Sequence, residues 1–339
     1  MSNEKQSARI AYIDVFRSFG IILMVMGHIG YGWTFDFFIH AFHMPMFFWI
    51  SGYLFKHKSS EEMPLSIFVL KKARSLLLPY CIFGLAHYFL YVVYYGIIKH
   101  EDVDISALSH LFSINTTGLP ICGALWFLTA LFFTDVLFFI LDRYIENHVF
   151  IAIIVGLIAI AGNILNNFLT FTLPFALGVS FVGLGLYYLG YIFKKYSNNK
   201  YIHFILNLSW IPNTILGVIT TILIFTNGYI NMRKGVYSII PLFWLNALLS
   251  IIVGVNYARL VYPFIENNFI GKWLRGVGRY SIVYVCLNQL VILIASKFIN
   301  AMSFPTIPSK IAILITSLLL LFISHQIIAH TKIRAIIGK

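Results

Sequence analysis

The chain contains about ten apolar segments of roughly 20 residues each, separated by short polar stretches. A transmembrane helix needs about 20 mostly apolar residues, and within lipid only helices and closed barrels satisfy every backbone hydrogen bond. We therefore expect an all-α, polytopic bundle of transmembrane helices. The expected spans cover approximately residues 11–31, 37–55, 75–98, 122–141, 149–166, 170–193, 207–227, 237–258, 280–299 and 309–330.

The composition excludes an ordinary soluble protein. Hydrophobic residues make up 60% of the 339 positions and charged residues only 11%, whereas soluble domains carry about 25% charged residues. Ten spans and their short loops leave no room for a folded soluble domain, so we expect one integral membrane domain. Cys81, Cys122 and Cys286 stand singly in apolar segments, which argues against a disulfide framework and against a metal site.

The net charge of +12 follows membrane topology rather than nucleic-acid binding. With the amino terminus inside, 18 of the 24 Lys and Arg residues fall in cytoplasmic segments, 5 fall in outer segments, and Arg17 lies within the first span. Short loops rich in Lys and Arg stay in the cytoplasm, so both termini are expected there. The sequence shows no repeat of the kind found in inverted-repeat transporters.

Arg17 and His28 are ionisable residues inside the first apolar segment. A charge at the bilayer centre costs on the order of 3 kcal/mol, so such residues normally face a bundle interior or a water-filled cavity. Eleven positions at about 100° each bring the two side chains to nearly one helix face, roughly 16 Å apart along the axis. Arg17 is then expected in the cytoplasmic half of the span and His28 near its outer end.

A structural role is the alternative for both residues. Arg17 can pair with Asp14, three residues earlier, or with Asp135 in the fourth span. His28 can simply bond to a neighbouring carbonyl. These alternatives stay open at the level of sequence.

The second apolar segment re-enters the membrane from outside, which places Asp36, His40 and His43 near the outer surface. His43 and His28 lie at the outer ends of consecutive antiparallel spans, so we expect them to approach each other. His40 is expected to be an interfacial residue.

A compact basic cluster, Lys71, Lys72 and Arg74, precedes the third span on the cytoplasmic side. Lys and Arg side chains bind phosphate groups through charge-assisted hydrogen bonds. The cluster therefore suits a phosphate-bearing ligand, although a purely topological role would produce the same pattern.

Several quoted stretches match one family. They are the Arg17-to-His28 spacing in IDVFRSFGIILMVMGH, FHMPMFFWISGYLF (42–55), KKARSLLLPY (71–80) and LWFLTALF (125–132), followed by LPFALGVSFVGLGLYYLGYIFKK (173–195) and RYSIVYVCLNQLVI (279–292). On these the chain resembles the bacterial acyltransferase family 3 membrane proteins, close to the fucose 4-O-acetylase-like members that O-acylate surface glycans. The resemblance covers most of the chain, and its specific part is the first 80 residues.

The resemblance implies a plasma-membrane enzyme that moves an acyl group, usually acetyl, from cytoplasmic acetyl-CoA to a hydroxyl of a surface glycan or lipid-linked saccharide. It places catalysis at His28 and donor binding at Arg17, Lys71 and Lys72. We add His43 as a second catalytic candidate, and Arg74 joins the donor cluster. A neutral imidazole can take the hydroxyl proton or carry the acyl group itself, and both routes remain open.

Five further positions are candidates for substrate contacts or for structural roles. Ser51 first suits close helix packing, with substrate contact as the alternative, and Trp126 first suits an interface anchor. Asp14 and Asp36 are candidates for structural or substrate contacts. Many relatives carry a histidine where this chain has Asn288, which cannot titrate near neutrality, so a proton relay in the ninth span is not expected.

A transporter or flippase is the rival interpretation, because polar residues would also line its bundle. The Arg and His spacing, the modest length and the lack of repeats favour the transferase. A non-catalytic scaffold would tolerate changes at Arg17 and His28. Acceptor specificity is expected in the short outer loops 99–120 and 226–238.

Overall fold

The computed structural model describes residues 10–57, 62–113, 123–169, 173–302 and 305–338. These ranges are helical almost throughout, which confirms the all-α class, and their one extended pairing is an isolated bridge between Asn231 and Val236. The helices are α1 (Ala11–Ile29), α2 (Trp33–His40), α3 (His43–Tyr53), α5 (Leu65–Lys72), η1 (Ala73–Leu77), α6 (Leu78–Tyr91), η2 (Val92–Ile98), α7 (Ala107–Ser113), η3 (Gly123–Leu125), α8 (Trp126–Tyr144), α9 (His148–Phe168), η4 (Pro174–Ala176), α10 (Leu177–Lys195), α11 (Lys200–Ile205), α12 (Trp210–Asn227), η5 (Met232–Lys234), α13 (Ile240–Ile265), α14 (Phe269–Arg279), α15 (Ser281–Asn300), α16 (Thr306–His330) and η6 (Lys332–Ile337).

Within the described ranges, nine helices are long and apolar enough to cross a membrane. They coincide with nine of the ten expected spans. The expected span 37–55 is instead two helices, α2 and α3, separated by Ala41 and Phe42. Pro45 in the first turn of α3 explains the break, because proline cannot donate to the carbonyl of Ala41 and its ring would collide with that carbonyl in a continuous helix.

Asparagine side chains start three of the helices that follow short loops. The Oδ1 atoms of Asn147, Asn199 and Asn268 accept backbone N–H groups at 2.9, 3.0 and 2.9 Å in the first turns of α9, α11 and α14. Each bond satisfies a donor that has no partner inside the helix. The chain therefore begins these helices at defined residues.

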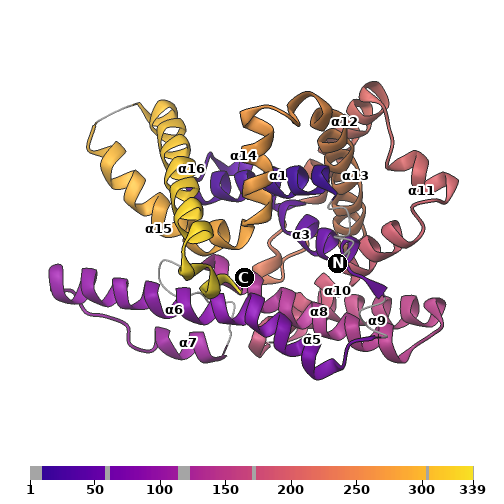
Figure 1. Cartoon of the computed structure of the whole chain (residues 1–339), viewed down its shortest axis with the longest axis horizontal. Helices are drawn as coiled ribbons and strands as arrows, with labels where there is room; N and C mark the ends of the chain where they lie inside the picture. Colours follow the sequence, from indigo (N-terminus) through magenta and orange to yellow (C-terminus); the bar gives the residue numbers. More distant parts are fainter. Residues whose placement is uncertain (1–9, 58–61, 114–122, 170–172, 303–304, 339) are drawn as a thin grey trace, which may run out of the picture.

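Helix α1 occupies the centre of the bundle. Figure 1 shows it between α15 and α16 on one side and α12 and α13 on the other. It packs against α3, α13, α14, α15 and α16. The surrounding helices therefore hold α1 in place, which fixes the positions of its side chains.

The short helix α3 is buried on nearly every side and packs closely against α10. Glycines make this approach possible. A Cβ atom at Gly52 would overlap the carbonyl oxygen of Tyr187, and one at Gly190 would overlap the carbonyl oxygen of Trp49. Such small-residue contacts allow transmembrane helix backbones to approach closely, so α3 is a rigid wall beside α1.

Candidate active site

Helix α1 lines two separate cavities, one toward each of its ends. We call the cavity that contains His28 the outer cavity and the one that contains Arg17 the inner cavity, after the expected orientation. The outer cavity has a volume of about 150 Å³ and the inner one of about 410 Å³. Helices α3 and α8 also contribute residues to the walls of both cavities, so α1, α3 and α8 each run from one cavity to the other.

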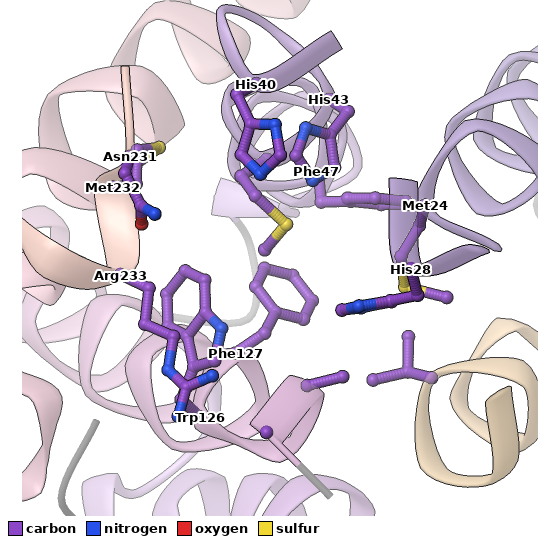
Figure 2. Close-up of a pocket in the computed structure, with 14 residues that line it drawn as sticks. Met24, His28, His40, His43, Phe47, Trp126, Phe127, Asn231, Met232 and Arg233 are labelled. Atoms are coloured by element: carbon purple, nitrogen blue, oxygen red, sulfur yellow. The ribbon is translucent and has the colours of Figure 1, made fainter. Parts of the chain in front are cut away.

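The outer cavity gathers three histidines. His28 comes from α1, His40 from α2 and His43 from α3, with Trp126 from α8 completing the wall. Figure 2 shows His40 and His43 along one side of the cavity, His28 on a second side, and Trp126 with Arg233 opposite His28. The expected approach of His43 and His28 to a common space is thus present in the structure.

Backbone carbonyls four residues earlier fix the orientation of two histidine rings. His40 Nδ1 lies 2.5 Å from the carbonyl oxygen of Asp36, and His43 Nδ1 lies 2.8 Å from that of Ile39. A carbonyl can only accept, so Nδ1 carries the proton in each ring and Nε2 is the basic nitrogen of the neutral form. The ring centroids are 5.2 Å apart.

His28 lies in the last turn of α1, which ends at Gly30 with φ of 77°. Its side chain is exposed, and Gln289 of α15 places its amide 3.4 Å from Nδ1. An amide can donate through nitrogen or accept through oxygen. The atom of Gln289 near the ring is Nε2, so Gln289 is positioned to donate to Nδ1 of His28.

The inner cavity is strongly basic. Arg17, Lys56, Lys71 and Lys72 line it, together with Ser51 and Ser75. The carboxylate of Asp135 also lines the cavity, so four cations against one anion leave a positive potential that attracts phosphate groups. The structure thus brings together three of the four residues expected to bind the donor.

The sequence left open whether Arg17 pairs with Asp14 or with Asp135, and the contacts of these residues answer the question. Arg17 Nη1 lies 3.3 Å from the carbonyl oxygen of Gly278 and 4.0 Å from the Asp14 carboxylate. Asp135 instead pairs with Lys72 at 2.9 Å and accepts the Tyr187 hydroxyl at 2.8 Å. The guanidinium is therefore held loosely by Asp14 while it lines the cavity.

Aromatic side chains separate the two cavities. Phe47 of α3 and Phe127 of α8 are both buried, with ring centroids 5.6 Å apart. Ser51 and Leu131, one turn further along these helices, already line the inner cavity. One turn is about 6 Å of helix, so the barrier between the cavities is thin.

The remaining expected residues lie at the edges of this arrangement. Arg74 is exposed and is absent from the described lining of the inner cavity, and Asp36 is half-buried in α2 outside the outer one. Asn288 donates only to carbonyls of its own helix, those of Tyr284 and Val285. Trp126 is a buried wall residue rather than an interface anchor.

Sequence reasoning missed two residues of the outer cavity. His40 was expected at the interface, yet its spacing of three from His43 is the signal that the two share a face across the helix break. Arg233 lies in the outer segment 226–238, and no helical periodicity points to it. Lys56, between the second and third spans, is a further cation of the inner cavity.

Comparison with known families identifies the type of protein. A family model described as an acyltransferase domain, that of acyltransferase family 3, matches residues 10–325. The chain belongs to acyltransferase family 3. The match runs from the start of α1 into α16, so it includes both cavities of this acyltransferase. Neither the curated proteins nor the solved structures gave a significant match.

Family membership and the apolar helices together define the coarse function. The protein is a multi-pass membrane acyltransferase. Its candidate site is a pair of cavities on one central helix, with imidazoles in one and cations in the other.

Proposed function

We propose that this acyltransferase moves an acyl group, most simply acetyl, from cytoplasmic acyl-CoA to a hydroxyl of an extracytoplasmic saccharide in the bacterial plasma membrane. The thioester C–S bond breaks, a new O–C ester bond forms, and His28 takes the hydroxyl proton or carries the acyl group between donor and acceptor. The free thiol of CoA and the acylated saccharide are the products.

The observation that carries this proposal is that α1 lines two cavities of different chemistry. Arg17 lines the basic inner cavity and His28 the outer cavity, roughly 16 Å apart at 1.5 Å per residue. Coenzyme A has its phosphates at one end and its thioester at the other. A donor bound by its phosphates in the inner cavity would therefore extend toward the imidazoles.

The barrier between the cavities sets a condition on this route. Phe47 and Phe127 line the outer cavity four residues before Ser51 and Leu131 of the inner one, so the extended arm of the donor has to pass these rings. Aromatic rings turn by rotation about side-chain bonds, and the backbone of α3 can stay in place against α10. A solute pathway would require a far wider opening, and no observation in the described residues favours one.

The test measures release of CoA thiol from acetyl-CoA by the purified protein in lipid nanodiscs, with and without extracted surface saccharide. We expect thiol release that depends on the saccharide. His28→Ala should abolish release, because the reacting imidazole is gone, while insertion and yield stay unchanged. His330→Ala is the control, since His330 is an exposed histidine that bonds only to the carbonyl of Gln326 in α16.

Arg17→Gln tests the donor end separately. We expect a raised KM for acetyl-CoA with a smaller change in kcat, because the substitution removes a cation from the inner cavity without touching the imidazoles. Full activity in His28→Ala, or an unchanged KM in Arg17→Gln, would remove that residue from its proposed role. Release of thiol that never depends on a saccharide would contradict the acceptor class.

A further inference from the structure

The loop between α12 and α13 is a folded element that forms part of the outer cavity. Its helical turn η5 is closed by Asn231, whose Oδ1 accepts the backbone N–H of Lys234 at 3.1 Å. Asn231 and Val236 exchange backbone hydrogen bonds of 2.7 and 3.0 Å. Gly235 ends the turn with φ of 69°, a conformation that suits glycine. The turn therefore presents Arg233 in one defined position.

The base of this loop is anchored to the helix bundle. Met232 and Tyr237 are buried on either side of Arg233. Asn227 Oδ1 accepts the backbone N–H of Ile239 at 3.1 Å, and Ser238 donates to the carbonyl of Tyr229 at 2.7 Å. These bonds and buried side chains hold the loop as part of the cavity wall rather than as a mobile lid.

Arg233 reaches inward past the start of η3. A Cβ atom at Gly123 would lie 2.5 Å from Arg233 Nη1, so the glycine leaves the space that the guanidinium occupies. Burial lowers the pKa of Arg233 below its ordinary value, yet a guanidinium stays charged in proteins. A permanent positive charge thus lies in the wall of a partly enclosed cavity.

The chemistry of the wall is suited to an anionic sugar. The described residues that line the outer cavity include no Asp or Glu, whereas Arg233, Asn231 and Trp126 lie together. A guanidinium matches the two oxygens of a carboxylate or phosphate, an amide binds hydroxyl groups, and an indole offers a flat apolar face with one N–H donor. The set fits a ring that carries hydroxyls and an acidic group.

Arg233 and His28 lie on different sides of the outer cavity, which indicates a different role for each. Figure 2 shows Arg233 across the cavity from His28, beside Trp126. Resting on the proposed function, we propose that Arg233 binds an anionic group of the saccharide acceptor, a carboxylate or a phosphate, and so makes the enzyme specific for an acidic acceptor. His28 would then meet a hydroxyl on the opposite side of the same ring or of its neighbour.

The experiment compares three acceptors with the full-length protein in nanodiscs: a neutral oligosaccharide, the same oligosaccharide carrying one hexuronic acid, and the neutral oligosaccharide on a polyprenyl diphosphate. We expect a kcat/KM about tenfold or more higher for a charged acceptor than for the neutral one. Preference for the uronic acid identifies a sugar carboxylate, and preference for the lipid-linked form identifies the carrier phosphate.

Arg233→Gln should lower kcat/KM for the preferred charged acceptor by roughly 10- to 100-fold, mainly through KM, because a charge-assisted hydrogen bond is lost. The loss should be much smaller with the neutral acceptor, and Arg233→Lys should retain part of the preference. Lys234→Gln is the matched control, since it removes the same charge from an exposed position of the same loop. Monodisperse elution in size-exclusion chromatography checks that each variant is folded.

Two results would overturn the inference. An equal loss for neutral and charged acceptors would mean that Arg233 stabilises the reacting carbonyl oxygen instead, and no loss with either would mean that it has no part in acceptor binding. Direct calorimetric binding of the three saccharides separates this inference from the proposed function. If none is acylated, charge-dependent binding that disappears in Arg233→Gln still supports the anion site, while charge-independent binding refutes it.

Discussion

Lys71 and Lys72 are sequence neighbours that line the same cavity but differ in their second contacts. Lys72 lies 2.9 Å from the Asp135 carboxylate, whose side chain is only 2% exposed and whose other oxygen accepts the Tyr187 hydroxyl. Lys71 is exposed. Lys72 therefore neutralises a buried carboxylate in addition to its place in the cavity, whereas Lys71 contributes only charge.

This difference predicts unequal effects on stability. Lys72→Met should lower the free energy of unfolding by about 3 kcal/mol, because removal of one partner leaves the buried Asp135 carboxylate uncompensated. Lys71→Met should change it by less than about 0.5 kcal/mol, as expected for an exposed position. Equilibrium unfolding in mixed micelles measures both values. Equal losses in the two variants would show that the pair with Asp135 does not stabilise the fold.

Single-helix periodicity explains which site residues the sequence could predict. The 100° step of an α-helix places Arg17 and His28 on one face of α1 from their spacing alone, and the structure has each lining a cavity. Arg233 could not be found in this way, because its position depends on hydrogen bonds within an irregular loop and on the space left by Gly123, more than 100 residues earlier. Such long-range contacts leave no periodic pattern.

At the scale of helices, the pair α2 and α3 shows that the length of an apolar segment does not by itself predict one continuous helix. The apolar length of residues 37–55 suggests one continuous span, and that expectation overlooked the local effect of Pro45. The break turns the chain so that His40 and His43 both point into the outer cavity and both donate from Nδ1 to carbonyls. The irregular backbone here forms the wall of a cavity, which is where broken membrane helices are tolerated.

The contact between α3 and α10 gives a prediction about a whole element. Gly190→Ala should destabilise the protein by about 1–3 kcal/mol or more, because its Cβ would overlap backbone atoms of α3 and the helices must separate. Gly156→Ala in α9 is the control, since a Cβ there meets no atom within 4 Å and alanine favours helix by up to about 1 kcal/mol. Thermal unfolding in nanodiscs compares the two. A stable Gly190→Ala variant would show that α10 can shift away from α3.

At the scale of the whole molecule, the described linings of the two cavities share no residue. Along α1, α3 and α8 the outer set gives way to the inner set within about one or two turns, and the buried rings of Phe47 and Phe127 lie between. Nine helices of the described residues are long and apolar enough to cross a membrane, and the α2–α3 pair takes the place of the remaining expected span. Because Arg17 and His28 lie toward opposite ends of α1, which is long enough to cross a membrane, we expect the two cavities at opposite faces of the membrane.

This arrangement predicts which face of the membrane each cavity opens toward. In a background with Cys81, Cys122 and Cys286 replaced by serine, Lys71→Cys should react with a membrane-impermeant maleimide only in inside-out vesicles, because Lys71 lines the basic inner cavity. Lys234→Cys, exposed on the loop of the outer cavity, should react only in intact cells. The reagent cannot cross lipid, so each reaction reports one side. Labelling of both positions from the same side would require an even number of crossings between them and would place donor and acceptor sites in one compartment.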